Sequence, residues 1–130
     1  MAFYLDTSAA VKLVVEEVGS AALRSWLADG DPVVVSSDLL RTELLRAVRR
    51  GAPAQVLQAR AVLDAVTLMT VSTSVFERAA TLEPAGMRSR DALHLASALE
   101  LGDDLEGIVT YDERLAEAVA MIGYPVVAPT

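Results

Sequence analysis

Four acidic side chains occupy positions where one acid alone has a structural role but a group of acids can hold a metal ion. Asp6 and Asp112 each follow a short apolar run, whereas Glu43 and Asp91 lie on or beside the apolar face of an expected helix. Carboxylate oxygens are the ligands that Mg²⁺ and Mn²⁺ prefer, and such an ion activates water for attack on a phosphate ester. If the four acids meet in the fold, the sequence predicts a metal-dependent hydrolytic site.

Each of these acids also has an ordinary structural explanation when it is taken alone. Asp6 and Asp112 can cap the helices that follow them. Glu43 can extend from the rim of its helix to water, and Asp91 can interact with a helix dipole. Two carboxylates about 5 Å apart repel by ~3 kcal/mol at an effective dielectric near 20, which makes an accidental cluster costly. We therefore expect Asp91→Asn to leave the metal-free protein at least as stable as the natural chain.

The elements that must position these acids alternate between strand and helix patterns. We expect strands at residues 3–6, 33–36, 68–72, 108–111 and 126–127, and helices at 8–15, 20–28, 38–50, 53–66, 74–83, 89–102 and 113–122. This alternation is typical of βα units and a parallel sheet. The carboxyl ends of parallel strands share one edge of the sheet, where ligand sites gather. Asp6 and Asp112 therefore meet if their strands are neighbours.

Length and composition limit the other classes of protein. The 130 residues fit a single domain spanning 1–130, and a hydrophobic fraction of 53% supports a buried core. The absence of cysteine excludes disulfides, thiolate zinc sites and a cysteine nucleophile, and a single histidine argues against zinc in general. Because neither a signal peptide nor a membrane-spanning segment is visible, we expect a cytoplasmic protein that does not bind membranes.

Net charge is the main objection to a nucleic-acid substrate. The formal charge is −7, from 18 acids and 11 bases, whereas nucleic-acid enzymes usually present a basic field. Two magnesium ions would cancel four carboxylates, and Lys12 is the only lysine, so the bases are mainly arginines, which suit phosphate. We expect five arginines around the site: Arg41, Arg49, Arg50, Arg88 and Arg90. The alternative is that these arginines lie on ordinary solvated helix faces. Arg41, Arg88 and Arg90 are the candidates for substrate binding.

Four motifs in order resemble those of a known family. They are Phe3–Ala9 (FYLDTSA), Arg41–Leu44 (RTEL), Arg90–Ala96 (RDALHLA) and Val109–Asp112 (VTYD). Together they resemble the PIN domain, and the short chain resembles the VapC toxins of VapBC toxin–antitoxin pairs. The resemblance covers essentially the whole chain.

The resemblance implies an α/β fold, a three-layer α/β/α sandwich with a five-stranded parallel sheet in the order 3-2-1-4-5. It implies a Mg²⁺-dependent endoribonuclease toxin, with Mn²⁺ able to substitute, an RNA substrate, a VapB-like antitoxin partner and a homodimer. The implied catalytic and metal-binding residues are Asp6, Glu43, Asp91 and Asp112, of which we expect Asp6 and Asp91 to be primary ligands. The supporting hydroxyls are those of Thr7, Ser8 and Thr110. If water attacks phosphorus, the products carry a 5′-phosphate and a 3′-hydroxyl.

Other classes of protein make demands that the sequence meets less well. A receiver domain or a haloacid-dehalogenase-type phosphatase needs a lysine or a second aspartate that the chain lacks at the required place. A catalytically silent PIN-like module that binds RNA or protein remains open, as does a DNA-cutting relative. His94 is expected on the polar side of its helix in a structural or surface role, and an antitoxin groove is expected near residues 9–15 and 21–27.

Overall fold

The computed structural model describes residues 1–130 and contains one parallel sheet. Its five short strands are β1 (Ala2–Leu5), β2 (Val34–Ser37), β3 (Thr67–Met69), β4 (Leu105–Val109) and β5 (Val126–Val127). All pairings are parallel, and the spatial order is β3-β2-β1-β4-β5. The predicted fold class and strand order are therefore confirmed, and β1 and β4 are neighbours at the centre of the sheet.

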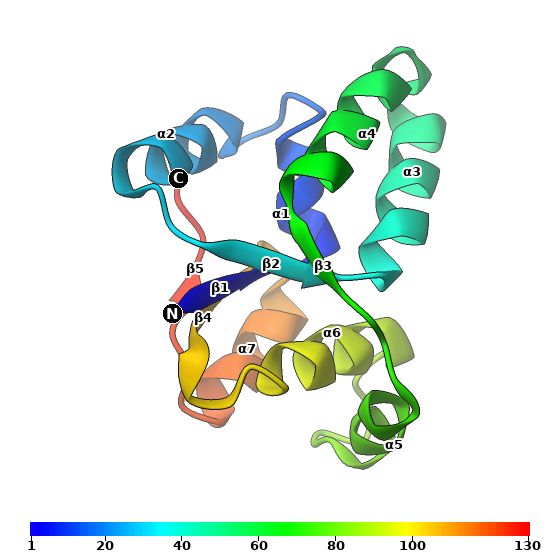
Figure 1. Ribbon diagram of the computed structural model, residues 1–130, viewed down its shortest axis with the longest axis vertical. Helices are drawn as coiled ribbons and strands as arrows, with labels where there is room; N and C mark the ends of the chain where they lie inside the picture. Colours follow the sequence, from blue (N-terminus) through cyan, green and yellow to red (C-terminus); the bar gives the residue numbers. More distant parts are fainter.

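Seven α-helices connect these strands and cover both faces of the sheet (Figure 1). They are α1 (Thr7–Lys12), α2 (Ser20–Gly30), α3 (Leu39–Gly51), α4 (Val56–Ala65), α5 (Thr73–Thr81), α6 (Ser89–Leu99) and α7 (Glu113–Met121), with short 3₁₀ turns at Pro53–Gln55 and Gly102–Asp104. In the view of Figure 1, α1 to α4 lie above the sheet and α5 to α7 lie below it. None of the helices is long and apolar enough to cross a bilayer.

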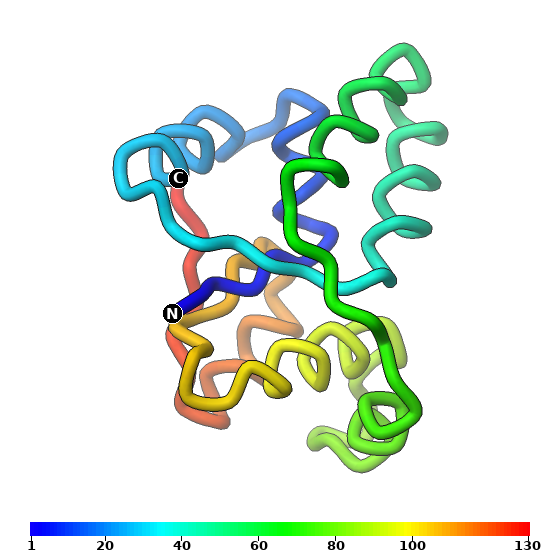
Figure 2. The backbone as a smooth tube through the Cα atoms, in the orientation of Figure 1, coloured from blue at the N-terminus to red at the C-terminus, as the bar shows by residue number.

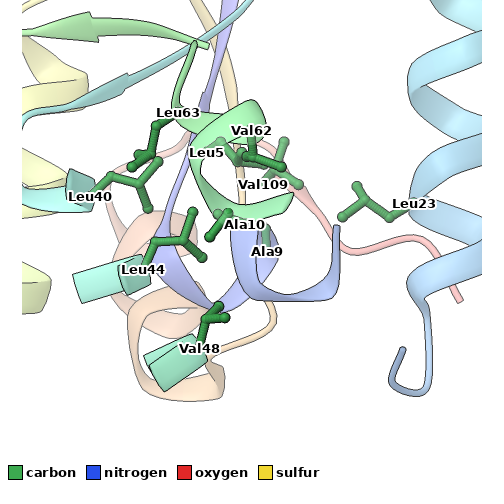
Figure 3. Packing of buried hydrophobic residues seen from close by; sticks show 11 residues of the cluster. Leu5, Ala9, Ala10, Leu23, Leu40, Leu44, Val48, Val62, Leu63 and Val109 are labelled. Atoms are coloured by element: carbon green, nitrogen blue, oxygen red, sulfur yellow. The ribbon is translucent and has the colours of Figure 1, made fainter. Parts of the chain in front are cut away.

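The apolar core has two parts because successive strand residues point to opposite faces of the sheet. Leu5 and Val109 pack with residues of α1, α3 and α4, and Figure 3 shows this cluster. Tyr4 and Ile108 face the other way, toward α6 and α7. The two parts make the sheet the middle of three layers.

The ends of several elements differ from those expected. Helix α1 ends at Lys12, three residues before the expected end. Helix α5 begins at Thr73, one residue before the expected start, and is capped by Ser72, whose hydroxyl accepts a hydrogen bond from the Val75 backbone nitrogen. Helix α6 ends at Leu99 because the chain turns before β4. These differences leave the order of the elements unchanged.

The C-terminal segment lies beside the start of α2, as the chain trace in Figure 2 shows. The Tyr111 hydroxyl donates a 2.8 Å hydrogen bond to the carbonyl of Pro129. Gly19 precedes α2 with a φ of 91° and lies so close to Tyr111 and Pro129 that a Cβ would be 3.2 Å and 3.3 Å from them. Glycine is favoured here because other residues rarely adopt this φ.

Candidate active site

A polar cleft lies where β1 and β4 end and where α3 and α6 approach the sheet. It has a volume of about 150 Å³, and none of its lining residues is hydrophobic. They are Asp6, Thr7, Ser8, Glu43, Arg90, Asp91, His94 and Asp112. A larger cavity of about 440 Å³ between α5 and α6 is mostly apolar and contains none of the four acids. The polar cleft is therefore the candidate site, and the fold brings all four acids to it.

Asp6 is buried at the carboxyl end of β1, with only 3% of the residue exposed. Its Oδ1 accepts hydrogen bonds from the Ala9 backbone nitrogen at 3.0 Å and the Ser8 hydroxyl at 2.7 Å. Its Oδ2 accepts one from the Thr110 hydroxyl at 2.6 Å. Burial raises the pKa of Asp6 above its ordinary value, although these hydrogen bonds oppose the rise. Asp6 thus both caps α1 and presents a firmly held carboxyl group to the cleft.

Asp112 caps α7 from the loop that follows β4. Its Oδ1 accepts hydrogen bonds from the backbone nitrogens of Arg114 at 3.0 Å and Leu115 at 3.1 Å. Its own backbone nitrogen donates to the Thr110 hydroxyl at 3.1 Å, which links it to Asp6. Partial burial raises the pKa of Asp112, but the Leu115 backbone and the charge of Arg88 outweigh this effect and lower the pKa below its ordinary value.

The Ser8 and Thr110 hydroxyls join the two strand ends. Ser8 Oγ accepts a 2.9 Å hydrogen bond from the Tyr111 backbone nitrogen and lies 3.4 Å from Thr110 Oγ1. Thr110 is itself fully buried. These hydroxyls fix Asp6 and the loop of Asp112 relative to each other.

Asp91 lies in the first turn of α6 and is paired with Arg88, the residue that precedes this helix. The Nε of Arg88 is 2.9 Å from Asp91 Oδ2, and its Nη2 contacts Asp112 Oδ2. The Asp91 side chain is only 7% exposed. Because one guanidinium holds both carboxylates, these acids already have a cationic partner within the protein. In this arrangement no three acidic or histidine side chains are poised together as a metal site.

Glu43 and His94 form a pair that the sequence did not reveal. The Nε2 of His94 lies 2.6 Å from Glu43 Oε1, and the Thr7 hydroxyl donates to the same oxygen at 2.7 Å. Burial raises the pKa of Glu43, but the hydrogen bonds from His94 and Thr7 outweigh it and lower the pKa below its ordinary value. His94 is 3% exposed and lines the cleft, so its placement on the polar side of the helix was wrong. Its spacing of three residues from Asp91 was the available signal, because such residues share a helix face.

The three arginines predicted to bind substrate lie in different surroundings. Arg90 is exposed and lines the cleft. Arg88 is engaged with Asp91 and Asp112, as described above. Arg41 forms an exposed 2.9 Å ion pair with Asp38 one turn before it and is not among the lining residues. The structure therefore places only Arg90 among the residues that line the cleft, and Arg88 lies beside it through its contacts with Asp91 and Asp112.

The donor set of the cleft suits a hard divalent cation. The available side-chain donors are carboxylate and hydroxyl oxygens apart from one histidine, and sulfur is absent. Magnesium and manganese take such oxygen ligands. To use Asp91 and Asp112 together, a cation has to compete with the guanidinium of Arg88. The side chains thus fit the metal in their chemistry.

Comparisons with known proteins agree over almost the whole chain. A family model described as the PIN domain matches residues 3–120. Ribonuclease VapC46 of Mycobacterium tuberculosis is 41% identical over 129 residues, which cover 99% of this chain and 98% of that protein. The crystal structure of Mycobacterium tuberculosis VapC20, a toxin that cleaves the sarcin-ricin loop, matches with a TM-score of 0.79 and 18% identity, covering 98% and 99% of the two chains. A toxin–antitoxin complex from Klebsiella pneumoniae matches with a TM-score of 0.73 and 20% identity over 98% of each chain.

Proposed function

The chain belongs to the PIN-domain family and, within it, to the VapC ribonucleases, and from this premise we propose that it is the RNA-cleaving toxin of a toxin–antitoxin pair. The observation that carries the proposal is the convergence of four acids, from β1, α3, α6 and the start of α7, on one polar cleft. None of the three other main cavities combines these groups. The reaction is hydrolysis of a phosphodiester bond.

Mg²⁺ is the cation that we assign to this cleft, with Mn²⁺ as a substitute. Asp6 and Asp91 are the primary ligands, and Glu43 and Asp112 bind directly or through water. When bound, the cation supplies Lewis-acid chemistry, because it activates water and stabilises the negative charge that develops on the phosphate. The all-oxygen carboxylate set supports this assignment.

The side chains of the chain itself hold the acids in place for this chemistry. Thr110 and Ser8 orient the Asp6 carboxyl group, and the first turn of α7 orients Asp112. Arg90, at the cleft, supplies a positive charge for the phosphate of the substrate. Because water rather than the ribose hydroxyl attacks phosphorus, we expect products with a 5′-phosphate and a 3′-hydroxyl.

Selection of RNA by an acidic protein requires a specific explanation. With a net charge of −7, the protein has no general basic field to attract nucleic acid. Metal binding removes part of the negative charge at the cleft, and Arg88 and Arg90 add a local positive charge there. We therefore expect weak, salt-sensitive affinity for RNA in general, with selectivity arising from the shape or loops of the RNA.

An antitoxin partner follows from the same premise. An apolar groove of about 260 Å³ contains Leu13 after α1, Leu27 of α2 and Val62 of α4. Leu13 and Leu27 fall in residues 9–15 and 21–27, near which we expected an antitoxin groove from the sequence. An apolar segment of a VapB-like protein is the expected occupant. A homodimer of the toxin remains a prediction from the family alone. Co-purification of the chain with the product of the adjacent reading frame, followed by measurement of the mass of the complex, tests both expectations.

The direct test of the function is an RNA-cleavage assay. Purified protein is incubated with a panel of structured RNAs and matched single-stranded DNAs, with Mg²⁺, with Mn²⁺ and with EDTA. We expect cleavage of RNA that requires the metal and is lost in Asp6→Ala. Glu106→Ala is the matched control, because it removes the same charge from an exposed position on β4. Binding of RNA without cleavage would favour the silent-module alternative, and cleavage of DNA alone would contradict the RNA substrate.

A further inference from the structure

His94 is buried in the cleft, and both nitrogens of its ring have hydrogen-bond partners. Its Nδ1 is 2.8 Å from the hydroxyl of Tyr4, which donates a 3.0 Å hydrogen bond to Ser37 Oγ. Its Nε2 is 2.6 Å from Glu43 Oε1 and 3.2 Å from Thr7 Oγ1. A chain of hydrogen bonds therefore runs from the interior of the sheet to a carboxylate in the cleft.

The position of the hydrogen on this ring follows from the partners. An ionised carboxylate has no hydrogen to donate, so Nε2 must carry the hydrogen that lies between His94 and Glu43. This holds for the charged ring, in which Nδ1 donates to Tyr4 and Tyr4 donates to Ser37, and for the neutral ring, in which Tyr4 donates to Nδ1 and accepts from the Ser37 hydroxyl instead. In both states His94 is a donor to Glu43, and the contact is a charge-assisted hydrogen bond, which is a strong type.

Both donors to Glu43 act on the same oxygen. His94 and Thr7 bind Oε1, whereas no side chain donates a hydrogen bond to Oε2. One oxygen is thus fixed from two directions, and the second oxygen remains available to a cation. A glutamate on a helix has three rotatable side-chain bonds, and this clamp restricts them before any ion arrives.

Tyr4 in turn holds the ring of His94 through its Nδ1. Tyr4 is fully buried in β1, and its ring meets the imidazole edge to face at a centroid distance of 5.7 Å. Burial raises the pKa of Tyr4 to about 12, so its hydroxyl keeps its hydrogen at any working pH. No buried side-chain polar atom in the protein lacks a partner. A satisfied buried network of this kind is rigid and therefore suited to orientation.

We propose that His94 is a positioning residue that, held by Tyr4, aims the free oxygen of Glu43 at the divalent cation. The inference rests on the proposed function, since it assigns a role to Glu43 in metal binding. Partners behind a metal ligand typically change metal affinity or activity by 10- to 100-fold when they are removed. A histidine that only filled space in the core would change stability and leave metal affinity unaltered.

The test measures Mn²⁺ affinity directly, from the electron paramagnetic resonance signal of the free ion, so that it does not depend on RNA cleavage. We expect His94→Leu to weaken Mn²⁺ binding about tenfold. His94→Gln should restore most of the affinity, because its amide nitrogen can take the place of Nε2. Tyr4→Phe, which keeps the aromatic core, should weaken binding about threefold by freeing the ring.

Two further variants separate positioning from a loss of stability. Ser20→Ala removes the hydrogen bonds of a fully buried hydroxyl on α2, remote from the cleft, and should leave Mn²⁺ affinity unchanged. In a Glu43→Gln background, His94→Leu should cause no further loss, because His94 acts through the Glu43 carboxylate. Thermal unfolding of every variant shows that the measured protein is folded.

Several outcomes would overturn the proposal. They are a folded His94→Leu with natural Mn²⁺ affinity, a His94→Gln no better than His94→Leu, and an equal loss in the Glu43→Gln background. Failure of the proposed function is a different result, in which the natural chain leaves every RNA intact while the Mn²⁺ affinities of the variants still fall in the expected order.

Discussion

Arg88 holds Asp91 through a 2.9 Å hydrogen bond between its Nε and Oδ2 of the carboxylate, across three residues at the start of α6. The same guanidinium contacts Asp112, which follows β4. In this arrangement the charges of two of the four acids are partly neutralised by a residue of the protein. A divalent cation that binds both acids has to displace this guanidinium, so Arg88 acts on metal affinity as well as on stability.

Arg88→Ala should therefore strengthen metal binding. The substitution removes a positive charge a few ångströms from the cation and frees both carboxylates, and we expect an increase in Mn²⁺ affinity on the order of tenfold. Calorimetric titration with Mn²⁺ measures this change. Arg24→Ala, which breaks an exposed ion pair with Glu16, is the control for the loss of one charge. Unchanged or weaker Mn²⁺ binding in Arg88→Ala would show that Arg88 does not compete with the cation.

The same ion pair alters the expectation for Asp91→Asn. Repulsion between acids alone predicts that this variant is at least as stable as the natural protein without metal. Because Arg88 compensates that repulsion and is itself 38% exposed, we now expect a small loss of about 0.5–1 kcal/mol. Thermal unfolding in EDTA measures it. An increase in melting temperature would mean that repulsion outweighs the ion pair, as the sequence alone suggested.

Asp6→Asn should stabilise the metal-free protein at neutral pH, in contrast to Asp91→Asn. Because burial raises the pKa of Asp6, the folded protein retains a proton that the unfolded chain releases above about 3.8, the ordinary value. The contribution of Asp6 to the free energy of unfolding therefore falls as pH rises through the window between these two pKa values. Asparagine has no charge, so we expect a melting temperature higher by a few degrees at pH 7, the size of a change of about 1 kcal/mol.

The pH profile distinguishes this cause from a change in packing. The advantage of Asp6→Asn should shrink as pH falls and disappear well below 3.8, where Asp6 is protonated in both the folded and the unfolded state. Asp112→Asn is the matched control of opposite sign, because the pKa of Asp112 is lowered in the folded protein. It should be less stable than the natural chain at pH 7, and the difference should narrow as pH falls. Asp6→Asn that melts below the natural protein at pH 7 would contradict the burial argument.

The sequence predicted the parts of the site that depend on local pattern. Asp6 and Asp112 follow apolar strands, and the ends of parallel strands share an edge, so their meeting required only that β1 and β4 be neighbours. Glu43 was found because a carboxylate interrupts the apolar stripe of α3. The strand order itself came from the family resemblance, since short parallel strands carry no pairing code that pattern alone reveals.

The sequence missed contacts that depend on how segments distant in the chain pack together. The hydrogen bond between His94 and Glu43 joins α6 to α3 across the sheet edge. Helix periodicity shows which residues share a face of a helix, but it cannot show which other helix that face contacts. Arg88 reaches Asp112 because of the path of the loop before α6. Arg41 was expected at the cleft, but it lies on the exposed face of α3, where Asp38 pairs with it.

In the proposed function, acids from four separate segments share one divalent cation site. Anomalous diffraction from crystals soaked in Mn²⁺ tests it most directly, because the signal marks the ion itself. We predict a peak in the polar cleft within about 2.5 Å of carboxylate oxygens of Asp6 and Asp91, with Arg88 turned away from Asp91. A cleft without a peak at Mn²⁺ concentrations that support RNA cleavage, or a fully occupied peak elsewhere, would contradict the account.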